Sequence, residues 1–299
     1  MSWILQRILN WVRYLVLRII KTGEIPTHVA FIMDGNRRYA NKRSIAKKEG
    51  HSKGFKILMK ALKWGLELGI TEITVYAFSI NNFNRSEEEV NDLIDLSRQK
   101  FKGFLEELDK LKDAGVCIRV FGNWSLLPKD VCQIIAQCMI ATKDNNKIIL
   151  NIAYSYTSRD ELTHAIKDIL KGIKHKNILP EDINEDLISN CLYTYKSSNP
   201  DLLIRTSGEF RLSDFLTWQI SNTCIYFTDV LWPELTPWKL LAAIFYYQSC
   251  SDLRKVKNNL KPIVHNSRVS MFVDKIHHER KTMIENISNN YEQLSSENV

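Results

Sequence analysis

From residue 24 onward, short apolar runs alternate with long segments of helical periodicity, and few architectures accommodate this alternation. We predict strands at 28–33, 72–78, 116–121, 148–153, 202–205 and 224–227. We predict helices between them, at 54–68, 86–112, 127–142, 158–171 and 236–249. Strands and helices in alternation are joined by right-handed crossovers and form a mostly parallel sheet covered on both faces. The sequence therefore predicts an α/β fold with a mostly parallel six-stranded sheet flanked by helices.

The first 21 residues have the pattern of an amphipathic helix. At about 100° per residue, one face collects the apolar side chains Ile4, Leu5, Ile8, Trp11, Val12, Leu15, Val16 and Ile19. Cations interrupt every apolar run, so the roughly 18 uncharged residues of a membrane-spanning helix never occur. The helix either docks on its own protein or lies in a membrane interface. The second interpretation is favoured because basic side chains are attracted to anionic lipid.

The polarity of the chain predicts three parts: an amphipathic membrane-associating helix at 1–23, an α/β domain at 24–250 and a helical tail at 251–299. Pro262 predicts a break in the tail, and its histidines (His265, His277 and His278) are expected at the surface rather than as ligands. The cysteines form no CxxC pair and do not cluster with histidine. We therefore expect reduced, mostly buried thiols and no structural zinc site.

Lysine and arginine number 41 against 34 acidic residues, which gives a net charge of +7. Such an excess favours a polyanionic partner: nucleic acid, an anionic membrane or a phosphorylated substrate. A nucleic-acid binder needs a basic stripe with interleaved aromatic residues on one surface. Here the cations divide between the first helix, the predicted strand ends and helix faces such as 42–48, so we expect no nucleic-acid partner.

Three of the predicted strands end in charged and small polar residues, at 34–38, 79–85 and 205–213. In open α/β sheets, ligands bind at the carboxyl ends of the strands. These three segments contain five arginines: Arg37, Arg38, Arg85, Arg205 and Arg211. Arginine binds oxyanions through paired hydrogen bonds, and five arginines suit two diphosphate groups better than one. Asp34 is then a natural Mg²⁺ ligand, because Mg²⁺ takes one or two carboxylates together with phosphate oxygens and waters.

Five blocks occur in uninterrupted order between residues 24 and 250: HVAFIMDGNRRYA, EGHSKGF, VYAFSINNFNRS, RTSGEFRLSDFLTWQ and YFTDVLWPEL. They resemble the signature blocks of the cis-prenyltransferases, and in particular of the eukaryotic heteromeric members. The resemblance implies the fold of that family and Mg²⁺ as cofactor. It also implies the reaction: isopentenyl diphosphate units are condensed onto farnesyl diphosphate with cis geometry, which gives the long-chain precursor of dolichol used in protein glycosylation.

The resemblance also implies roles for individual residues. Asp34 would hold Mg²⁺. The allylic diphosphate would be bound by Gly35, Asn36, Arg37, Arg38, His51 and Arg85. The diphosphate of isopentenyl diphosphate would be bound by Arg205, Arg211 and Ser213. Ser79 and Asn82 would orient the reacting ends, so the residues expected to act in the reaction are Asp34, Arg38, Ser79 and Asn82.

Several positions depart from the single-subunit bacterial members: Asn81 and Cys224 stand where those have glutamate, and Asn123 where they have aspartate. No Arg-x-Gly occurs in the sequence. In the family that motif completes the isopentenyl diphosphate site, and in heteromeric members a second subunit of the Nogo-B receptor type supplies it. The resemblance thus implies such a partner, docked on 236–249 and 224–227, and a chain that is weakly active alone. It also implies a peripheral place on the cytosolic face of the endoplasmic reticulum membrane.

Two further alternatives concern the role of the chain and of its longest apolar helix. A non-catalytic scaffold subunit of the same assembly would be expected to lose DGN-R-R and R-x₅-R-x-S, and both motifs are intact. The helical segment 93–111 either lines an apolar tunnel for the growing product or packs in the core, and its spacing does not separate the two.

Overall fold

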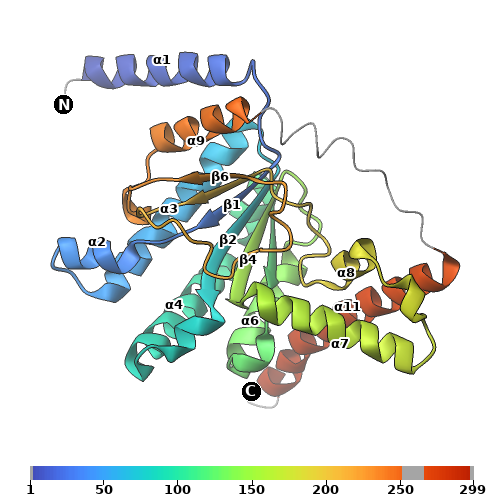
Figure 1. Cartoon of the computed structure of the whole chain (residues 1–299). Coiled ribbons are helices and arrows are strands. Elements are labelled where there is room, and N and C mark those ends of the chain that lie inside the picture. The colour runs from blue at the N-terminus through green and yellow to red at the C-terminus, as the bar shows by residue number, and fades with distance from the viewer. Residues whose placement is uncertain (1–2, 251–265, 297–299) are drawn as a thin grey trace. The chain divides into compact units, whose positions relative to one another are not determined.

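The strands form one six-stranded sheet, and the computed structural model describes residues 3–250 and 266–296 (Figure 1). The strands are β1 (His28–Ile32), β2 (Glu72–Ser79), β3 (Val116–Phe121), β4 (Ile148–Tyr156), β5 (Leu202–Arg205) and β6 (Cys224–Phe227). Their order in the sheet is β3-β4-β2-β1-β5-β6. β5 pairs in parallel with both β1 and β6, and β3 pairs in parallel with β4. The predicted α/β fold is confirmed, and every predicted strand is present.

The long helices lie where the sequence predicts them. The helices are α1 (Trp3–Ile20), α2 (Asn36–Lys42), α3 (Lys47–Leu68), α4 (Glu87–Glu106), α5 (Leu108–Ala114), α6 (Lys129–Ala141), α7 (Ser158–Lys174), α8 (Glu185–Cys191), α9 (Pro237–Ser249) and α11 (Ser267–Ser296). The short helices α2 and α8 were not predicted, and one predicted helix is divided in two. The helix expected at 86–112 is two helices, α4 and α5, which meet at Glu107. Pro262 lies outside the described residues.

The chain divides into two compact units. Among the described residues, the first comprises 3–75, 199–211 and 219–250, and the second comprises 76–198, 212–218 and 266–296. The boundary falls within β2. The division into 1–23, 24–250 and 251–299 made from the sequence stays a prediction.

In the first unit, two glycines of α3 allow α2 to pack closely against it. A Cβ atom added at Gly50 would lie 2.5 Å from the backbone oxygen of Asn36, and one at Gly54 would lie 2.2 Å from Asn36 Oδ1. Real Cβ atoms do not come this close to a backbone oxygen, so a side chain at Gly50 would push α2 and α3 apart, whereas one at Gly54 would displace the Asn36 side chain. The close packing holds the start of α2, which directly follows β1, in place.

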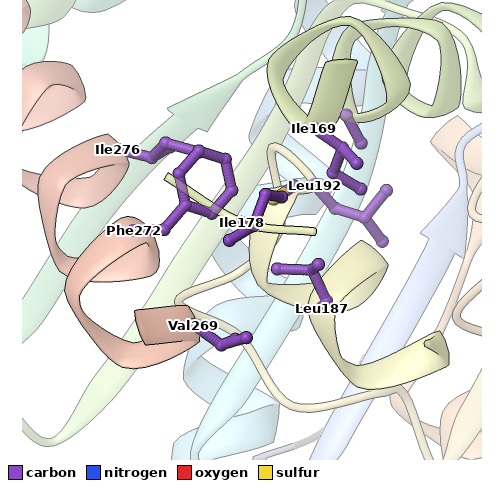
Figure 2. Close-up of a cluster of buried hydrophobic side chains, with 9 residues drawn as sticks. Ile169, Ile178, Leu187, Leu192, Val269, Phe272 and Ile276 are labelled. Carbon is purple, nitrogen blue, oxygen red and sulfur yellow. The ribbon is translucent and has the colours of Figure 1, made fainter. Parts of the chain in front are cut away.

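In the second unit, α11 is fixed to α7 and α8 by a buried apolar cluster (Figure 2). The cluster consists of Ala165, Ile169, Ile178, Leu187, Cys191, Leu192, Val269, Phe272 and Ile276. At the start of α11, Arg268 donates to both carboxylate oxygens of Asp182 at 2.9 and 3.0 Å. The helical tail is thereby confirmed over 267–296, and it packs as part of this unit.

The histidines of the tail differ in their surroundings. His278 is exposed, as predicted. His277 is half-buried: its ring stacks on Tyr195 with centroids 3.9 Å apart, and Nε2 lies 2.9 Å from the Asn190 backbone oxygen. The expected surface position is therefore wrong for His277, and His265 lies outside the described residues.

Replacing Phe272 with alanine is expected to lower the free energy of unfolding by about 3–5 kcal/mol, the usual cost of deleting a buried phenylalanine ring. Phe272 is buried, and its ring lies against Gly172 of α7, where an added Cβ would be 2.4 Å from it. Urea unfolding measures the change. Met271→Ala is the matched control, because the neighbouring side chain is exposed and should lose less than about 0.5 kcal/mol. Equal losses in the two variants would contradict the docking of α11.

The apolar segment 93–111, for which the sequence leaves a product tunnel and the core as alternatives, contributes some of its side chains to the core. Ile94, Phe101 and Phe104 of α4 are buried, and the two phenylalanine rings meet edge to face at 6.1 Å. Leu93, Leu96 and Leu105 are half-buried. The buried residues therefore pack in the core, and the tunnel role of the others stays a prediction.

Candidate active site

Asp34 lies two residues beyond β1, and hydrogen bonds to its carboxylate and its backbone oxygen fix its position. Its Oδ1 accepts from the Gly35 N–H at 2.7 Å, and its backbone oxygen accepts from the Trp232 N–H at 3.0 Å and the Thr206 hydroxyl at 2.8 Å. Gly35 has a φ of +103°, and a Cβ there would lie 2.9 Å from the Leu231 side chain. Glycine is needed at this turn because a side chain would be strained and would clash.

Two arginines converge on the Asp34 carboxylate. Arg205 Nη2 at the end of β5 lies 3.0 Å from Asp34 Oδ2, and Arg38 Nη2 lies 3.6 Å from the same oxygen. The Arg205 side chain is only 3% exposed, whereas that of Asp34 is 34% exposed. A buried guanidinium is thus neutralised by a carboxylate that still reaches solvent. This arrangement leaves Asp34 accessible to a ligand while Arg205 is held rigidly behind it.

The loop after β5 completes this cluster. Arg38 donates to the Ser207 hydroxyl and lies 3.4 Å from Glu209 Oε1. Arg205 donates to the Arg211 backbone oxygen, and the Arg211 guanidinium pairs with Glu209. The first unit therefore brings together four of the predicted residues: Asp34, Arg38, Arg205 and Arg211.

Ser207 and Glu209 were not predicted as site residues, although both contact the arginines. Ser207 and Gly208 adopt left-handed φ values of 80° and 72°. This turn directs Ser207 towards Arg38. The Ser-Gly-Glu sequence directly after the strand was the available signal, but Ser-Gly is also an ordinary turn dipeptide.

The other predicted residues of the first unit have varied surroundings. The Asn36 amide donates to the Met33 backbone oxygen at 3.1 Å, so its side chain stabilises the turn after β1. Arg37 is exposed, and His51 is half-buried in α3. The roles of Asn36, Arg37 and His51 in diphosphate binding stay predictions.

The remaining predicted residues belong to the second unit. Ser79 and Asn82 cap the short helix Ile80–Asn84 together: Asn82 Oδ1 accepts from the Ser79 N–H at 3.0 Å, and Ser79 Oγ accepts from the Asn81 N–H at 3.2 Å. Arg85 pairs with Glu89 at 2.8 Å. The backbone oxygen of Ser213, which has a left-handed φ of 52°, accepts from the Tyr76 hydroxyl at 3.3 Å. The reaction roles of Ser79 and Asn82 stay predictions, as do the substrate contacts of Arg85 and Ser213.

Two of the three positions that depart from the bacterial pattern, Asn123 and Cys224, have side chains with defined contacts. Asn123 accepts from Ser125 and donates to Asp160 at 3.1 Å, so it stabilises the loop after β3. Cys224 is buried, with its Sγ 2.9 Å from that of Cys250. All six cysteines are free thiols and five are buried, as expected. Burial raises the pKa of Cys138 to about 12, which keeps this thiol protonated and unreactive.

The family follows from a match over most of the chain. A family model described as putative undecaprenyl diphosphate synthase matches residues 32–254. The chain belongs to this family of cis-prenyltransferases. It is 53% identical over 260 residues to the dehydrodolichyl diphosphate synthase complex subunit of Homo sapiens, over 86% of this chain and 78% of that protein.

More distant relatives of this cis-prenyltransferase agree with the assignment. The tritrans,polycis-undecaprenyl-diphosphate synthase (geranylgeranyl-diphosphate specific) of Pyrococcus abyssi is 42% identical over 79% of this chain and 89% of that protein. The crystal structure of lavandulyl diphosphate synthase from Lavandula x intermedia in complex with dimethylallyl diphosphate matches with a TM-score of 0.71 and 32% identity. That match covers 75% of this chain and 95% of the other. The family resemblance and the expected fold are both confirmed.

The side chains of this cis-prenyltransferase could bind Mg²⁺ only together with a bound diphosphate. Within residues 3–250 and 266–296, no group of three or more His, Cys, Asp or Glu side chains is placed to hold a metal ion. Asp34 offers one partly exposed carboxylate beside two guanidinium groups that would bind phosphate oxygens. Because Mg²⁺ commonly binds through one or two carboxylates plus substrate phosphates and waters, the residues fit this mode of binding.

Proposed function

We propose that the chain is the catalytic subunit of a dehydrodolichyl diphosphate synthase that uses Mg²⁺ and condenses isopentenyl diphosphate onto farnesyl diphosphate with cis geometry. The product would be the precursor of dolichol used in protein glycosylation. The observation that carries this proposal is the pairing of buried Arg205 with accessible Asp34, next to Arg38. The 53% identity to the human complex subunit supports the choice of reaction.

In this reaction the diphosphate leaves the allylic carbon, the double bond of isopentenyl diphosphate attacks that carbon, and a proton is lost. Charge develops on the departing diphosphate, and guanidinium groups held in place before the reaction stabilise it without reorganisation. Arg38 is held in this way by Ser207 and Glu209. Arg205 is held by Asp34 and would bind the diphosphate of isopentenyl diphosphate. Bound Mg²⁺ would supply further neutralisation of the diphosphate charge.

An assay with radiolabelled isopentenyl diphosphate tests the activity, run with the partner subunit and Mg²⁺. Farnesyl and geranylgeranyl diphosphate are compared as acceptors, because the Pyrococcus relative is named as specific for the latter. We expect long labelled products from farnesyl diphosphate and none after chelation of Mg²⁺. If the complex incorporated label equally well with this chain inactivated at Asp34, the chain would be a scaffold subunit instead.

We further propose a partner subunit of the Nogo-B receptor type that supplies the Arg-x-Gly motif. The human and mouse relatives are named as subunits of a complex, and no Arg-x-Gly occurs in these 299 residues. α9 carries exposed apolar side chains, with Phe245 69% and Tyr246 45% exposed. Such residues are common at the centres of protein interfaces.

Replacing Phe245 with aspartate is expected to weaken partner binding at least tenfold, because a charge would have to be buried at the interface. Size-exclusion chromatography and titration calorimetry with the purified partner measure this. Leu126→Asp is the control, since Leu126 is exposed on a different element. Unchanged affinity of the Phe245 variant would move the interface away from α9.

We also propose that α1 binds the cytosolic face of the endoplasmic reticulum membrane. Its last residue, Ile20, is buried, and the Gln248 side chain donates to the Ile20 backbone oxygen at 2.8 Å, so the end of α1 is docked on α9. Trp11 and Ile19 are 62% and 67% exposed and remain available to lipid. No helix among the described residues has the length and apolar character to cross a bilayer.

Deleting residues 1–21 is expected to reduce binding to phosphatidylserine vesicles about 1000-fold. The deletion removes four cations, each of which contributes about 1 kcal/mol near an anionic surface. Cosedimentation with vesicles measures the loss, and Trp11→Ser with Ile19→Ser separates apolar insertion from charge. Equal sedimentation of the full and shortened chains would show that α1 serves only to dock on α9.

A further inference from the structure

A cavity of about 1120 Å³ lies within the second unit, and none of the predicted active-site residues lines it. Its walls come from β3 and the loop after it, α6, α7, residues 193–197 and the middle of α11. Its volume slightly exceeds the roughly 300–1,000 Å³ of most small-molecule sites. The cavity is therefore large enough for a ligand of its own.

The α11 wall of the cavity is held firmly in place. The apolar cluster of Figure 2 anchors the preceding turns of α11 through Val269, Phe272 and Ile276. Arg280 then donates to the backbone oxygens of Leu192 and Cys191, both at 2.6 Å. A wall with this many contacts gives the cavity a defined shape.

The charge of the lining is strongly positive. It includes five cations: Arg119, Lys129, Lys167, Lys196 and Arg280. Asp160 is the carboxylate of the lining, and it accepts from the Tyr193 hydroxyl at 3.0 Å and Asn123 at 3.1 Å. Among the described residues, the only carboxylate partner of these five cations is Asp168, which pairs with Arg280 at 3.1 Å. The excess positive charge favours an anionic ligand.

Two of these cations, Arg119 and Lys196, are neighbours in the cavity wall. Arg119 donates to the Lys196 backbone oxygen at 2.8 Å, and Lys196 Nζ lies 5.5 Å from the centre of the Tyr195 ring. Burial, followed by the positive charges of Arg119 and Lys281, lowers the pKa of Lys196. Like charges held close together repel, and a bound anion would relieve this repulsion.

The residues of α11 that line the cavity after Arg280 are apolar. Arg280, Met283, Ile284 and Ile287 line the cavity at spacings of three, four and seven residues, which places them on one face of the helix. At 1.5 Å per residue, this face extends about 10 Å along the helix axis between Arg280 and Ile287. Trp124 and Met139 add further apolar surface to the lining. The cavity thus combines cations with an extended apolar wall.

We propose that this cavity binds a phosphate monoester of an apolar chain, with the phosphate against Arg119 and Lys196 and the chain along Met283, Ile284 and Ile287. Phosphate suits the cations because it carries up to two negative charges and matches the planar geometry of arginine. An alkyl or isoprenyl chain suits the apolar helix face. A prenyl phosphate and lysophosphatidic acid share this chemistry, and the experiment separates them.

Titration calorimetry on the full chain tests the proposal with four probes: farnesyl monophosphate, oleoyl lysophosphatidic acid, farnesol and inorganic phosphate. The double variant Arg119→Gln with Lys196→Gln should bind the phosphate esters at least tenfold more weakly, with prenyl transfer unchanged within twofold. Ile284→Trp should also weaken ester binding, because it fills the space of the chain without altering charge. Circular dichroism checks that each variant is folded.

Lys110→Gln with Lys112→Gln is the matched control, because it removes the same charge from α5, outside the cavity. It should bind both esters as the unaltered chain does. Binding of only one ester would identify the source of the ligand and support the proposal. Two results would overturn it: equal ester affinity in the Arg119 and Lys196 double variant, or inorganic phosphate binding as tightly as the esters.

Discussion

Arg205→Ala is expected to lower kcat/KM for isopentenyl diphosphate by about 10²–10⁴-fold. Arg205 donates to the Asp34 carboxylate and the Arg211 backbone oxygen from a buried position. Hydrogen bonds to charged groups contribute about 1.5–3 kcal/mol each, so losing two donors to the substrate diphosphate would raise the barrier by about 3–6 kcal/mol. Steady-state kinetics of the complex with radiolabelled substrate measures the change.

A second variant separates charge from geometry at this position. Arg205→Lys keeps the charge but loses the paired donors, so it should recover only part of the activity. Arg43→Ala is the control, because Arg43 forms an exposed pair with Glu234 and should change the kinetics less than twofold. Circular dichroism and thermal unfolding report whether the Arg205 variants are folded. A folded Arg205→Ala chain with ordinary kinetics would remove this residue from the site.

Asp34→Asn is expected to reduce turnover at least 10³-fold and to abolish its dependence on Mg²⁺ concentration. The amide keeps the shape of the side chain but removes the negative charge, and amides are weaker ligands of Mg²⁺ than carboxylates. It also leaves Arg205 buried beside a neutral group, which disfavours the orientation of the guanidinium. Activity measured across a Mg²⁺ titration tests both effects.

Asp95→Asn is the control for the loss of one carboxylate, because Asp95 pairs with Arg98 on the surface of α4. Its Mg²⁺ titration should match that of the unaltered chain. A folded Asp34→Asn variant with the same half-maximal Mg²⁺ concentration and turnover would show that another group holds the metal.

The strand positions were predictable because buried parallel strands need near-continuous apolar runs, and this chain has six of them. The long helices were predictable from their periodicity. α2 and α8 were missed because seven residues make only two turns, too few for a periodic pattern. The break at Glu107 was missed because the apolar pattern continues across it into α5.

The candidate active site was also predictable from the sequence only in part. Asp34, Arg38 and Arg205 were predicted from their places after strands and from motif order, and the structure brings them together. Ser207 and Glu209 were missed, since their contacts with Arg38 depend on a left-handed turn. The half-burial of His277 was missed as well, because it depends on where α11 packs against Tyr195.

The sequence alone determined the fold class, the family and the order of the motifs, because apolar periodicity and residue identity are local properties. Only the tertiary structure decided that Arg205 is buried while its partner Asp34 stays accessible, since burial depends on which segments pack together. It likewise decided that the tail helix is part of the second unit and forms one wall of a cationic cavity. Residues 119, 196 and 280 are distant in the sequence. A hydrogen bond joins Arg119 to Lys196, and the packing of α11 places Arg280 on the same surface.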